Sequence, residues 1–139
     1  MKKEGKYIGR YISQIHRKGN IFISKELNVL GIGSGQVMFL LELYRGDGRS
    51  QEDLAEVLNI DKGTTARALK KLEDAEFIIR RKDEIDKRAY KVCLTDKGKN
   101  MKNNVCAIMK NWENKITSNL DEKESETILY LLNKICTTM

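Results

Sequence analysis

The chain contains no proline, and its glycines gather at two places, Gly31–Gly35 and Gly46–Gly48. Because proline breaks helices and glycine marks turns, this distribution predicts a series of helices joined by short turns. No apolar run exceeds the five residues Val37–Leu41, and no signal-peptide core follows the lysine-rich start. We therefore expect a cytoplasmic protein with no membrane partner.

Histidine and cysteine are scarce as well. His16 is the single histidine, so a cluster of ligands for a metal ion is not expected. The three cysteines, Cys93, Cys106 and Cys136, form no C-x-x-C pair and predict no disulfide framework. A glycine-rich phosphate loop and a Ser/His/Asp or Cys/His constellation are also missing. An enzyme is therefore the weakest functional hypothesis, and no cofactor is expected.

Positive charge is plentiful but regional. The formal net charge is +6 and the sequence pI is about 9.2, which favours a polyanionic partner. The segment 1–18 holds six Lys/Arg against one Glu, and the segment 62–91 holds ten Lys/Arg against six acids. The segment 121–134 instead has four acids and two lysines. Charge alone does not separate nucleic acid from an acidic membrane surface, so the motifs must decide.

Helical periodicity and capping residues predict most of the elements. The first helix is expected from about Glu4 to Leu27, with Gly19 and Asn20 weakening its middle. The fifth is expected to run without a break to about Ile116. The later helices are expected to begin after residues with a capping side-chain oxygen: Ser34, Ser50, Asp61, Thr95 and Asp121. Capping boxes are predicted for two of them, a weak one at Ser50 and Asp53 and a second at Asp121 and Glu124.

The stretch "SQEDLAEVLNIDKGTTARALKKLEDA" predicts two short helices joined by a tight turn. In its second helix, Thr65, Leu69 and Leu72 recur at i, i+4 and i+7 and form a face for packing. The opposite face carries polar side chains that can meet a partner: Thr64, Arg67 and Lys71. The pattern is that of a helix-turn-helix, whose second helix fits a DNA major groove about 12 Å wide.

The next two runs, "FIIRR" and "AYKVCL", have the composition of strands and flank the charged segment "KDEIDKR". Alternation places Tyr90, Val92 and Leu94 on one face, and Lys91 and Cys93 on the other. A hairpin attached to a helix-turn-helix is a winged helix. The fold class is thus mainly α (α+β), with a winged helix-turn-helix.

The first and last helices carry more apolar residues than a small winged domain can cover. The last helix is expected to bury Ile128, Leu131, Leu132 and Ile135. Burial of apolar surface is worth roughly 25 cal/mol per Å², so leaving these side chains wet would cost several kcal/mol. A symmetric homodimer, the commonest oligomer, would cover them.

The chain resembles the MarR-type transcriptional regulators. The resemblance lies in "GSGQVMFLLELY", the helix-turn-helix stretch, "FIIRR", the sequence Asp86-Lys87-Arg88 and "VCLTDKGK". It implies a homodimer in which helices of residues 1–30 and 96–139 intertwine, while residues 31–95 form the winged DNA-binding region. It also implies binding to pseudo-palindromic duplex DNA, usually as a repressor. One departure is "DAEF", where the family often has Gly at the position of Glu76, so we expect the helix before it to end by a different backbone route.

The residues expected at the DNA interface follow from the motif and the resemblance. Arg67 is the best candidate to read a base, because a guanidinium pairs with guanine O6 and N7. The resemblance places Arg88 in the minor groove and pairs Asp86 with a nearby arginine to hold the wing, while Arg80 and Arg81 either contact the DNA backbone or brace the wing. The complete predicted set is Ser50, Asp61, Lys62, Gly63, Thr64, Thr65, Arg67, Lys70, Lys71, Lys82, Asp86, Lys87 and Arg88.

The resemblance further implies an effector, a small anionic or phenolic molecule bound between the dimer helices and the winged domain. Residues that can approach such a ligand are His16, Arg17, Lys18 and Tyr44. A winged helix that docks proteins instead of DNA is the alternative function, since fold alone does not determine function. An acidic or apolar surface on the recognition helix would favour that alternative, whereas this sequence places cations there.

Overall fold

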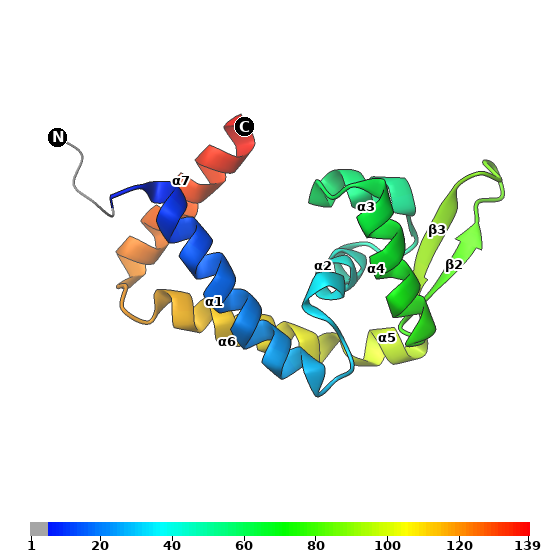
Figure 1. The fold of residues 1–139 in the computed structure, drawn as a ribbon, viewed down its shortest axis with the longest axis horizontal. Coiled ribbons are helices and arrows are strands. Elements are labelled where there is room, and N and C mark those ends of the chain that lie inside the picture. Colours follow the sequence, from blue (N-terminus) through cyan, green and yellow to red (C-terminus); the bar gives the residue numbers. More distant parts are fainter. Residues whose placement is uncertain (1–5) are drawn as a thin grey trace.

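The computed structural model describes residues 6–139, which form helices and a small antiparallel sheet. In chain order the elements are α1 (Ile8–Asn28), α2 (Ser34–Arg45), β1 (Arg49–Ser50), α3 (Gln51–Leu58), α4 (Lys62–Asp74), β2 (Ile78–Lys82), β3 (Tyr90–Leu94), α5 (Asp96–Asn100), α6 (Lys102–Thr117) and α7 (Glu122–Thr138). Figure 1 shows α1, α6 and α7 at one end, and the strands with α2 to α5 at the other. The predicted winged helix-turn-helix is confirmed.

The core lies where the winged half meets the adjoining ends of α1 and α6. Fully buried side chains come from every layer of this region: Leu27, Phe39, Leu40, Leu43, Leu54, Leu69, Leu72, Phe77, Ile78, Val92 and Val105. Leu27 belongs to α1 and Val105 to α6, so the core crosses both proposed boundaries of the winged region, at residues 30/31 and 95/96. Those boundaries stay predictions.

The sheet has the strand order β1-β3-β2, with both pairs antiparallel. Strands β2 and β3 pair along their whole length, from Ile78 opposite Leu94 to Lys82 opposite Tyr90. Strand β1 is only two residues long and pairs with Val92 and Lys91. Strand β1 was not predicted, because its two residues belong to "RGDGRS", the stretch expected to end the preceding helix. From Lys91 toward the tip of the hairpin, the wing is therefore a two-stranded ribbon.

Most of the predicted helix caps are present. Ser50, Asp61, Thr95 and Asp121 each accept a hydrogen bond from the backbone N–H three residues ahead. The box of Asp121 and Glu124 is complete, with distances of 2.7 and 3.0 Å. Two details were wrong. Gly33, not Ser34, occupies the N-cap of α2. The Asp53 carboxylate pairs with Arg49 at 2.9 Å instead of completing a capping box with Ser50.

The other differences concern the helix ends. Helix α1 begins at Ile8, and the predicted start at Glu4 lies outside the described residues. The predicted fifth helix is divided at Met101 into α5 and α6. The predicted helix ends at Leu27 and Ile116 lie within one residue of the observed ends at Asn28 and Thr117, which is the usual variation of helix boundaries.

The chain leaves helix α4 through a residue in the left-handed conformation. The expectation that this helix ends by a different backbone route was therefore wrong. Glu76 has φ = +66°, so a glutamate occupies the position where glycine is cheap. The Phe77 N–H donates to the Leu72 carbonyl at 3.0 Å, and the Glu76 N–H to that of Glu73 at 2.9 Å. These bonds satisfy the end of the helix, and they hold Glu76 in its strained conformation.

Replacing Glu76 with glycine should therefore raise the free energy of unfolding by about 1 kcal/mol, because glycine adopts positive φ without a Cβ clash. Denaturant unfolding followed by circular dichroism would measure it. Glu76→Ala is the matched control, since alanine removes the carboxylate and keeps the strain. Equal stability of the glycine and alanine variants would show that no strain is relieved.

Helices α1 and α6 pack closely because a glycine leaves room for a tryptophan. Gly19 is buried, and a Cβ added to it would lie 2.9 Å from the Trp112 ring. Trp112 also meets Phe22, with ring centroids 5.8 Å apart, and the Lys115 ammonium lies 5.1 Å from the Phe22 centroid. Gly19 was expected to weaken α1, but α1 runs unbroken past it, and Gly19 lies against Trp112 of α6.

Candidate nucleic-acid interface

The start of α4 is held by one carboxylate. Asp61 Oδ1 accepts from the Thr64 N–H at 2.8 Å, and Oδ2 accepts from the Thr64 hydroxyl at 2.7 Å. These two bonds, the backbone one first, lower the pKa of Asp61, with a smaller contribution from the nearby Arg67 charge. The hydroxyl in turn accepts from Arg67 Nη2 at 3.2 Å. The first turn of α4 thus presents Arg67 beside an ordered helix N-terminus.

The exposed face of α4 contains five of the seven contacts predicted on this helix. Lys62, Gly63, Thr64, Arg67 and Lys71 are all exposed. Gly63 leaves space for Arg67, because a Cβ there would lie 3.3 Å from Arg67 Nη1. An open cationic surface on a helix of this kind is suited to a polyanion.

Two members of the predicted set on α4 are placed differently. Thr65 is fully buried, so the structure removes it from the DNA-facing surface, and its hydroxyl has no partner among the described residues. Lys70 is exposed but directs its ammonium to Asp74, 2.9 Å away, and lies 3.9 Å from Glu73. Ser50, half-buried at the start of α3, uses its hydroxyl to cap that helix.

The tip of the wing is closed by hydrogen bonds. The Asp83 N–H donates to the Ala89 carbonyl at 2.9 Å, and Asp83 Oδ1 accepts from the Ile85 N–H at 2.9 Å. The bond from Ile85 lowers the pKa of the Asp83 carboxyl. Asp86 Oδ1 accepts from the Arg88 N–H at 3.1 Å. These bonds order the loop that carries Arg88.

The expected pairing of Asp86 with an arginine side chain is not what the structure shows. Asp86 makes no ion pair within residues 6–139 and stabilises the wing through the Arg88 backbone. Lys82, Lys87 and Arg88 are exposed. Ile85 was assigned no role and is 96% exposed at the tip, where its apolar side chain stands out among charged neighbours.

The same two roles, DNA contact or bracing of the wing, were predicted for Arg80 and Arg81, and the structure places the two side chains differently. Arg81 is exposed, whereas the Arg80 side chain is 20% exposed and pairs with Glu73 of α4. Sequence reasoning missed Glu73 and Gln51 as partners of Arg80. The glutamate is seven residues away and the glutamine 29, so no local pattern connects them to Arg80.

The four predicted effector residues are not brought together. His16 lines a largely apolar hollow of about 620 Å³ between α1, α2, α6 and α7, and its side chain contacts Asn20 at 3.3 Å. Arg17, Lys18 and Tyr44 do not line it. The Tyr44 hydroxyl donates instead to the Gly98 carbonyl at 2.7 Å, and burial, with a smaller effect of Cys106, raises its pKa to about 12.

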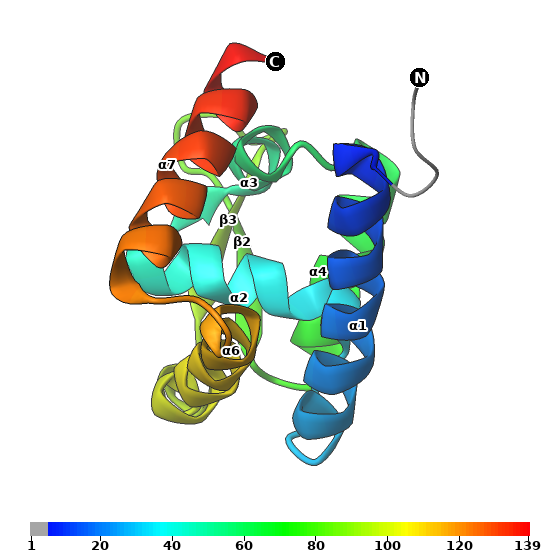
Figure 2. The same ribbon diagram turned by 90° about the vertical axis from the view of Figure 1, so that its left-hand side faces the viewer.

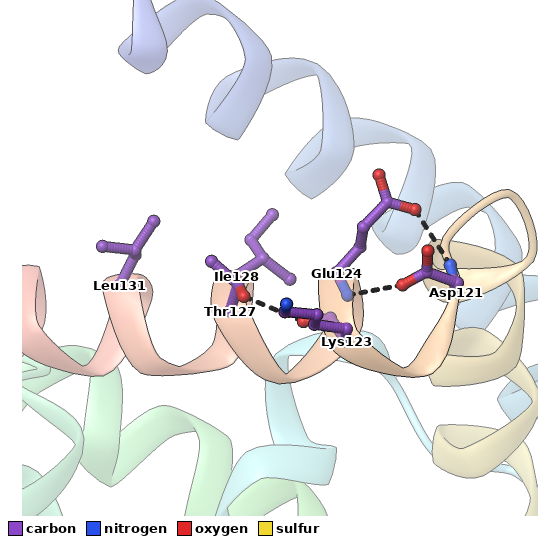
Figure 3. Close-up of a pocket in the computed structure, with 6 residues that line it drawn as sticks. All are labelled: Asp121, Lys123, Glu124, Thr127, Ile128 and Leu131. Carbon is purple, nitrogen blue, oxygen red and sulfur yellow. Dashed lines mark hydrogen bonds between the residues drawn. The ribbon is translucent and has the colours of Figure 1, made fainter.

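The same region of the molecule exposes apolar side chains of α7. Ile128, Leu131, Leu132 and Ile135 are 39 to 47% exposed, so the chain alone does not bury them as expected. Figure 2 shows α1 and α7 on either side of α2, and Figure 3 shows Ile128 and Leu131 projecting from one side of α7. Beside them lies a further hollow of about 410 Å³ that extends to Asp121.

Two further features of the described residues concern metal ions and membranes. No group of three or more His, Cys, Asp and Glu in residues 6–139 is placed to hold a metal ion. None of the helices in this part of the chain is both long and apolar enough to cross a membrane. The three cysteines are free, with Cys93 half-buried and Cys106 and Cys136 exposed.

The helix pair α3 and α4, the wing and the cationic face define a DNA-binding protein of the winged helix-turn-helix class. The MarR family model matches residues 32–90. The HTH-type transcriptional regulator BilQ of Clostridium symbiosum is 33% identical over 126 residues, which are 90% of this chain and 88% of that protein. The chain therefore belongs to the MarR family of transcriptional regulators.

Solved structures agree with this assignment. A MarR transcriptional regulator from Methanosarcina mazei is 43% identical, with a TM-score of 0.91 over 94% of each chain. A cysteine-to-serine mutant of MarR from E. coli, complexed with operator DNA, is 26% identical, with a TM-score of 0.84 over 92% of each chain. These relatives are transcriptional regulators.

Proposed function

We propose that the chain is a homodimeric repressor that binds a pseudo-palindromic operator, with α4 in the major groove and the wing in the minor groove. One observation carries the proposal: the exposed cations of α4 lie beside an ordered wing that presents Arg88, in a fold whose E. coli neighbour is complexed with operator DNA. The rest of the proposal assigns roles to individual side chains.

On α4, Arg67 reads a guanine through its guanidinium, while Lys62 and Lys71 hold phosphates. The N–H groups in the first turn after Asp61 face a phosphate, which a helix N-terminus favours. On the wing, Arg88 enters the minor groove, where narrow A-T tracts concentrate negative potential. Lys82 and Lys87 contact the DNA backbone from either side of the tip.

The partner in the homodimer is a second copy that covers the apolar faces of α1 and α7. Ile8, Ile12 and Ile15 of α1 are 43 to 69% exposed and line the same hollow as the apolar face of α7. An apolar surface contributed by two helices and rimmed by polar residues is typical of a protein interface. A two-fold dimer would also place two α4 helices on successive half-sites of a palindrome.

Replacing Arg88 with alanine should weaken operator binding about tenfold and reduce the slope of log K against log salt by about 0.9, the value for one neutralised phosphate. The reason is that the Arg88 side chain has no protein partner within the described residues, so its charge is available to DNA. Fluorescence anisotropy titrations on a selected operator at several salt concentrations would measure both quantities.

The matched control for Arg88→Ala is Lys110→Ala, which removes one positive charge from the exposed side of α6. It should leave operator affinity within about twofold of wild type, because the lost charge is away from the proposed interface. Equal affinity of wild type and Arg88→Ala would exclude the wing from the DNA contact. Failure of the wild type to bind any genomic fragment at low salt would favour a protein-interaction module.

The proposal includes release from DNA by a small anionic or phenolic effector in the hollow between α1, α2, α6 and α7. Of the four predicted effector residues, His16 is the one that lines this space. We expect the regulator to act in the cytoplasm and without an enzymatic activity of its own.

A further inference from the structure

Arg80 directs its charge away from the surface that the rest of the wing presents. It is the third residue of β2, and its side chain is 20% exposed, whereas the next two residues, Arg81 and Lys82, are exposed. A long cationic side chain on a wing is ordinarily solvated. Its position therefore requires partners in the body of the protein.

Those partners come from three other elements. Nε and Nη2 of Arg80 donate to the two carboxylate oxygens of Glu73 on α4, at 3.3 and 3.1 Å. Nη1 donates to Gln51 Oε1 at the start of α3, at 3.4 Å. The guanidinium carbon lies 5.9 Å from the ring centroid of Tyr90 on β3. One side chain thus connects β2 to both helices of the helix-turn-helix and to the neighbouring strand.

The connection is made where the wing loses its third strand. Arg80 lies opposite Val92, and Val92 is also paired with Arg49 of β1. One residue further along, Ser50 of β1 makes its last pair, with Lys91. A two-stranded ribbon is only marginally stable and twists more than a wider sheet. The Arg80 contacts therefore hold β2 within the last two positions at which the wing has a third strand.

We propose that Arg80 is a positioning residue that fixes the wing relative to the recognition helix α4, so that the major-groove and minor-groove contacts are made together. The inference rests on the proposed binding of DNA by these two elements. Glu73 is the necessary partner, because a two-point contact between guanidinium and carboxylate sets an angle as well as a distance. The Arg80 hydrogen bonds also hold the pKa of Glu73 below its usual value, so the carboxylate is charged at neutral pH.

Arg80 differs from a phosphate contact in a measurable way. Its Nε, Nη1 and Nη2 atoms all donate to protein oxygens, and the Glu73 carboxylate balances its charge. Because Arg80 would neutralise no phosphate, its charge would release no counterion when DNA binds. Removal of the guanidinium should therefore leave the salt dependence unchanged in a variant that already lacks the Arg88 contact.

The test replaces Arg80 with methionine, which keeps an unbranched side chain and removes the donors. Operator affinity should fall about tenfold, comparable to a mismatched base pair, while affinity for random duplex DNA should fall less, and the salt slope should fall by no more than the value of about 0.9 that Arg88→Ala removes. Glu73→Gln should give a similar loss from the other side of the pair. Denaturant unfolding of each variant would show that the folded state is retained under the binding conditions.

A double-mutant cycle separates positioning from general damage. If Arg80 acts through the wing, adding Arg80→Met to Arg88→Ala should cost less than about twofold more, because the wing contact is already lost. Exchange of the pair, Glu73→Arg with Arg80→Glu, should recover part of the affinity that each single change removes.

Three outcomes would overturn the inference. A further fall of the salt slope by about 0.9 when Arg80→Met is added to Arg88→Ala would make Arg80 a phosphate contact. Unchanged operator affinity would leave it without a role in binding, and equal losses on operator and random DNA would indicate a general structural defect. A wild-type protein that binds no DNA would instead contradict the proposed function itself.

Discussion

Replacement of Gly98 with alanine is expected to lower the free energy of unfolding by about 3 kcal/mol, near the upper end for a single added methyl group. Gly98 is buried in α5, and a Cβ there would overlap the Phe77 carbonyl oxygen and come within 3.2 Å of Leu94 Cδ2. The Phe77 carbonyl is backbone at the end of the helix-turn-helix, so it cannot swing aside as a side chain would. Chemical denaturation of the purified protein would measure the loss.

The cost is high because α5 is fastened to that backbone at several points. The Thr95 N–H donates to the Phe77 carbonyl at 3.1 Å, and the Thr95 hydroxyl to that of Glu76 at 2.6 Å. Lys97 Nζ donates to the Ala75 carbonyl at 2.8 Å. Any movement of α5 that makes room for a methyl group would stretch these three bonds. It would also move the Gly98 carbonyl, which accepts from Tyr44.

Gly35→Ala provides the control for Gly98→Ala. Gly35 lies in α2, and nothing is within 4 Å of a Cβ added there, so alanine should raise stability by up to about 1 kcal/mol through helix propensity. Both substitutions replace glycine with alanine, but they should change the free energy of unfolding in opposite directions. A Gly98→Ala variant as stable as Gly35→Ala would mean that α5 is not held against the end of the recognition helix.

The parts of the fold that could be predicted depend on neighbours in the sequence. The caps at Asp61, Thr95 and Asp121 each join a side chain to an N–H three residues ahead, so the local sequence contains both partners. The hairpin was visible for the same reason, as two strand-like runs around a charged turn. Glu76 shows the limit of rules based on residue type, because the hydrogen bonds that end α4 hold it at positive φ, where its residue type argues for another path.

The parts that could not be predicted depend on contacts between distant residues. Gly19 and Gly98 look like weak points in helices until Trp112 and the Phe77 carbonyl are placed against them. Strand β1 is too short to have a periodicity, and it exists because Val92 and Lys91 offer it an edge. Close packing of this kind is a property of the assembled fold, which no single segment specifies.

The candidate interface was predictable in outline for a similar reason. The helical periodicity of α4 separates an exposed face from a packed one, and the predicted cations lie on the exposed face. Which cations remain available is a tertiary matter. Lys70 is paired with Asp74, Arg80 is paired with Glu73, and the Arg88 side chain has no ion-pair partner among residues 6–139. Charge patterns therefore locate the surface, and the ion pairs select the residues that can reach DNA.

The second large effect is expected at the opposite end of the molecule, where Leu131→Asp should convert the proposed dimer to monomers. Leu131 is 47% exposed in the single chain and lines both hollows beside α7. Burying an aspartate without a partner costs several kcal/mol, and a two-fold interface contains the substitution twice. A penalty of about 4 kcal/mol would raise the dimer dissociation constant about a thousandfold.

Operator binding should decrease together with dimerisation, because a monomer can occupy only one half-site of a palindrome and loses the second set of contacts. Sedimentation velocity would give the oligomeric state, and anisotropy titrations on full and half operators would give the affinities. Asn133→Asp adds the same charge to α7 outside both hollows and should remain dimeric. If Leu131→Asp also remained dimeric, the partner would have to cover a different surface. If it became monomeric with unchanged affinity for the full operator, each winged half would bind DNA independently, and the apolar face of α7 would serve assembly without contributing to recognition.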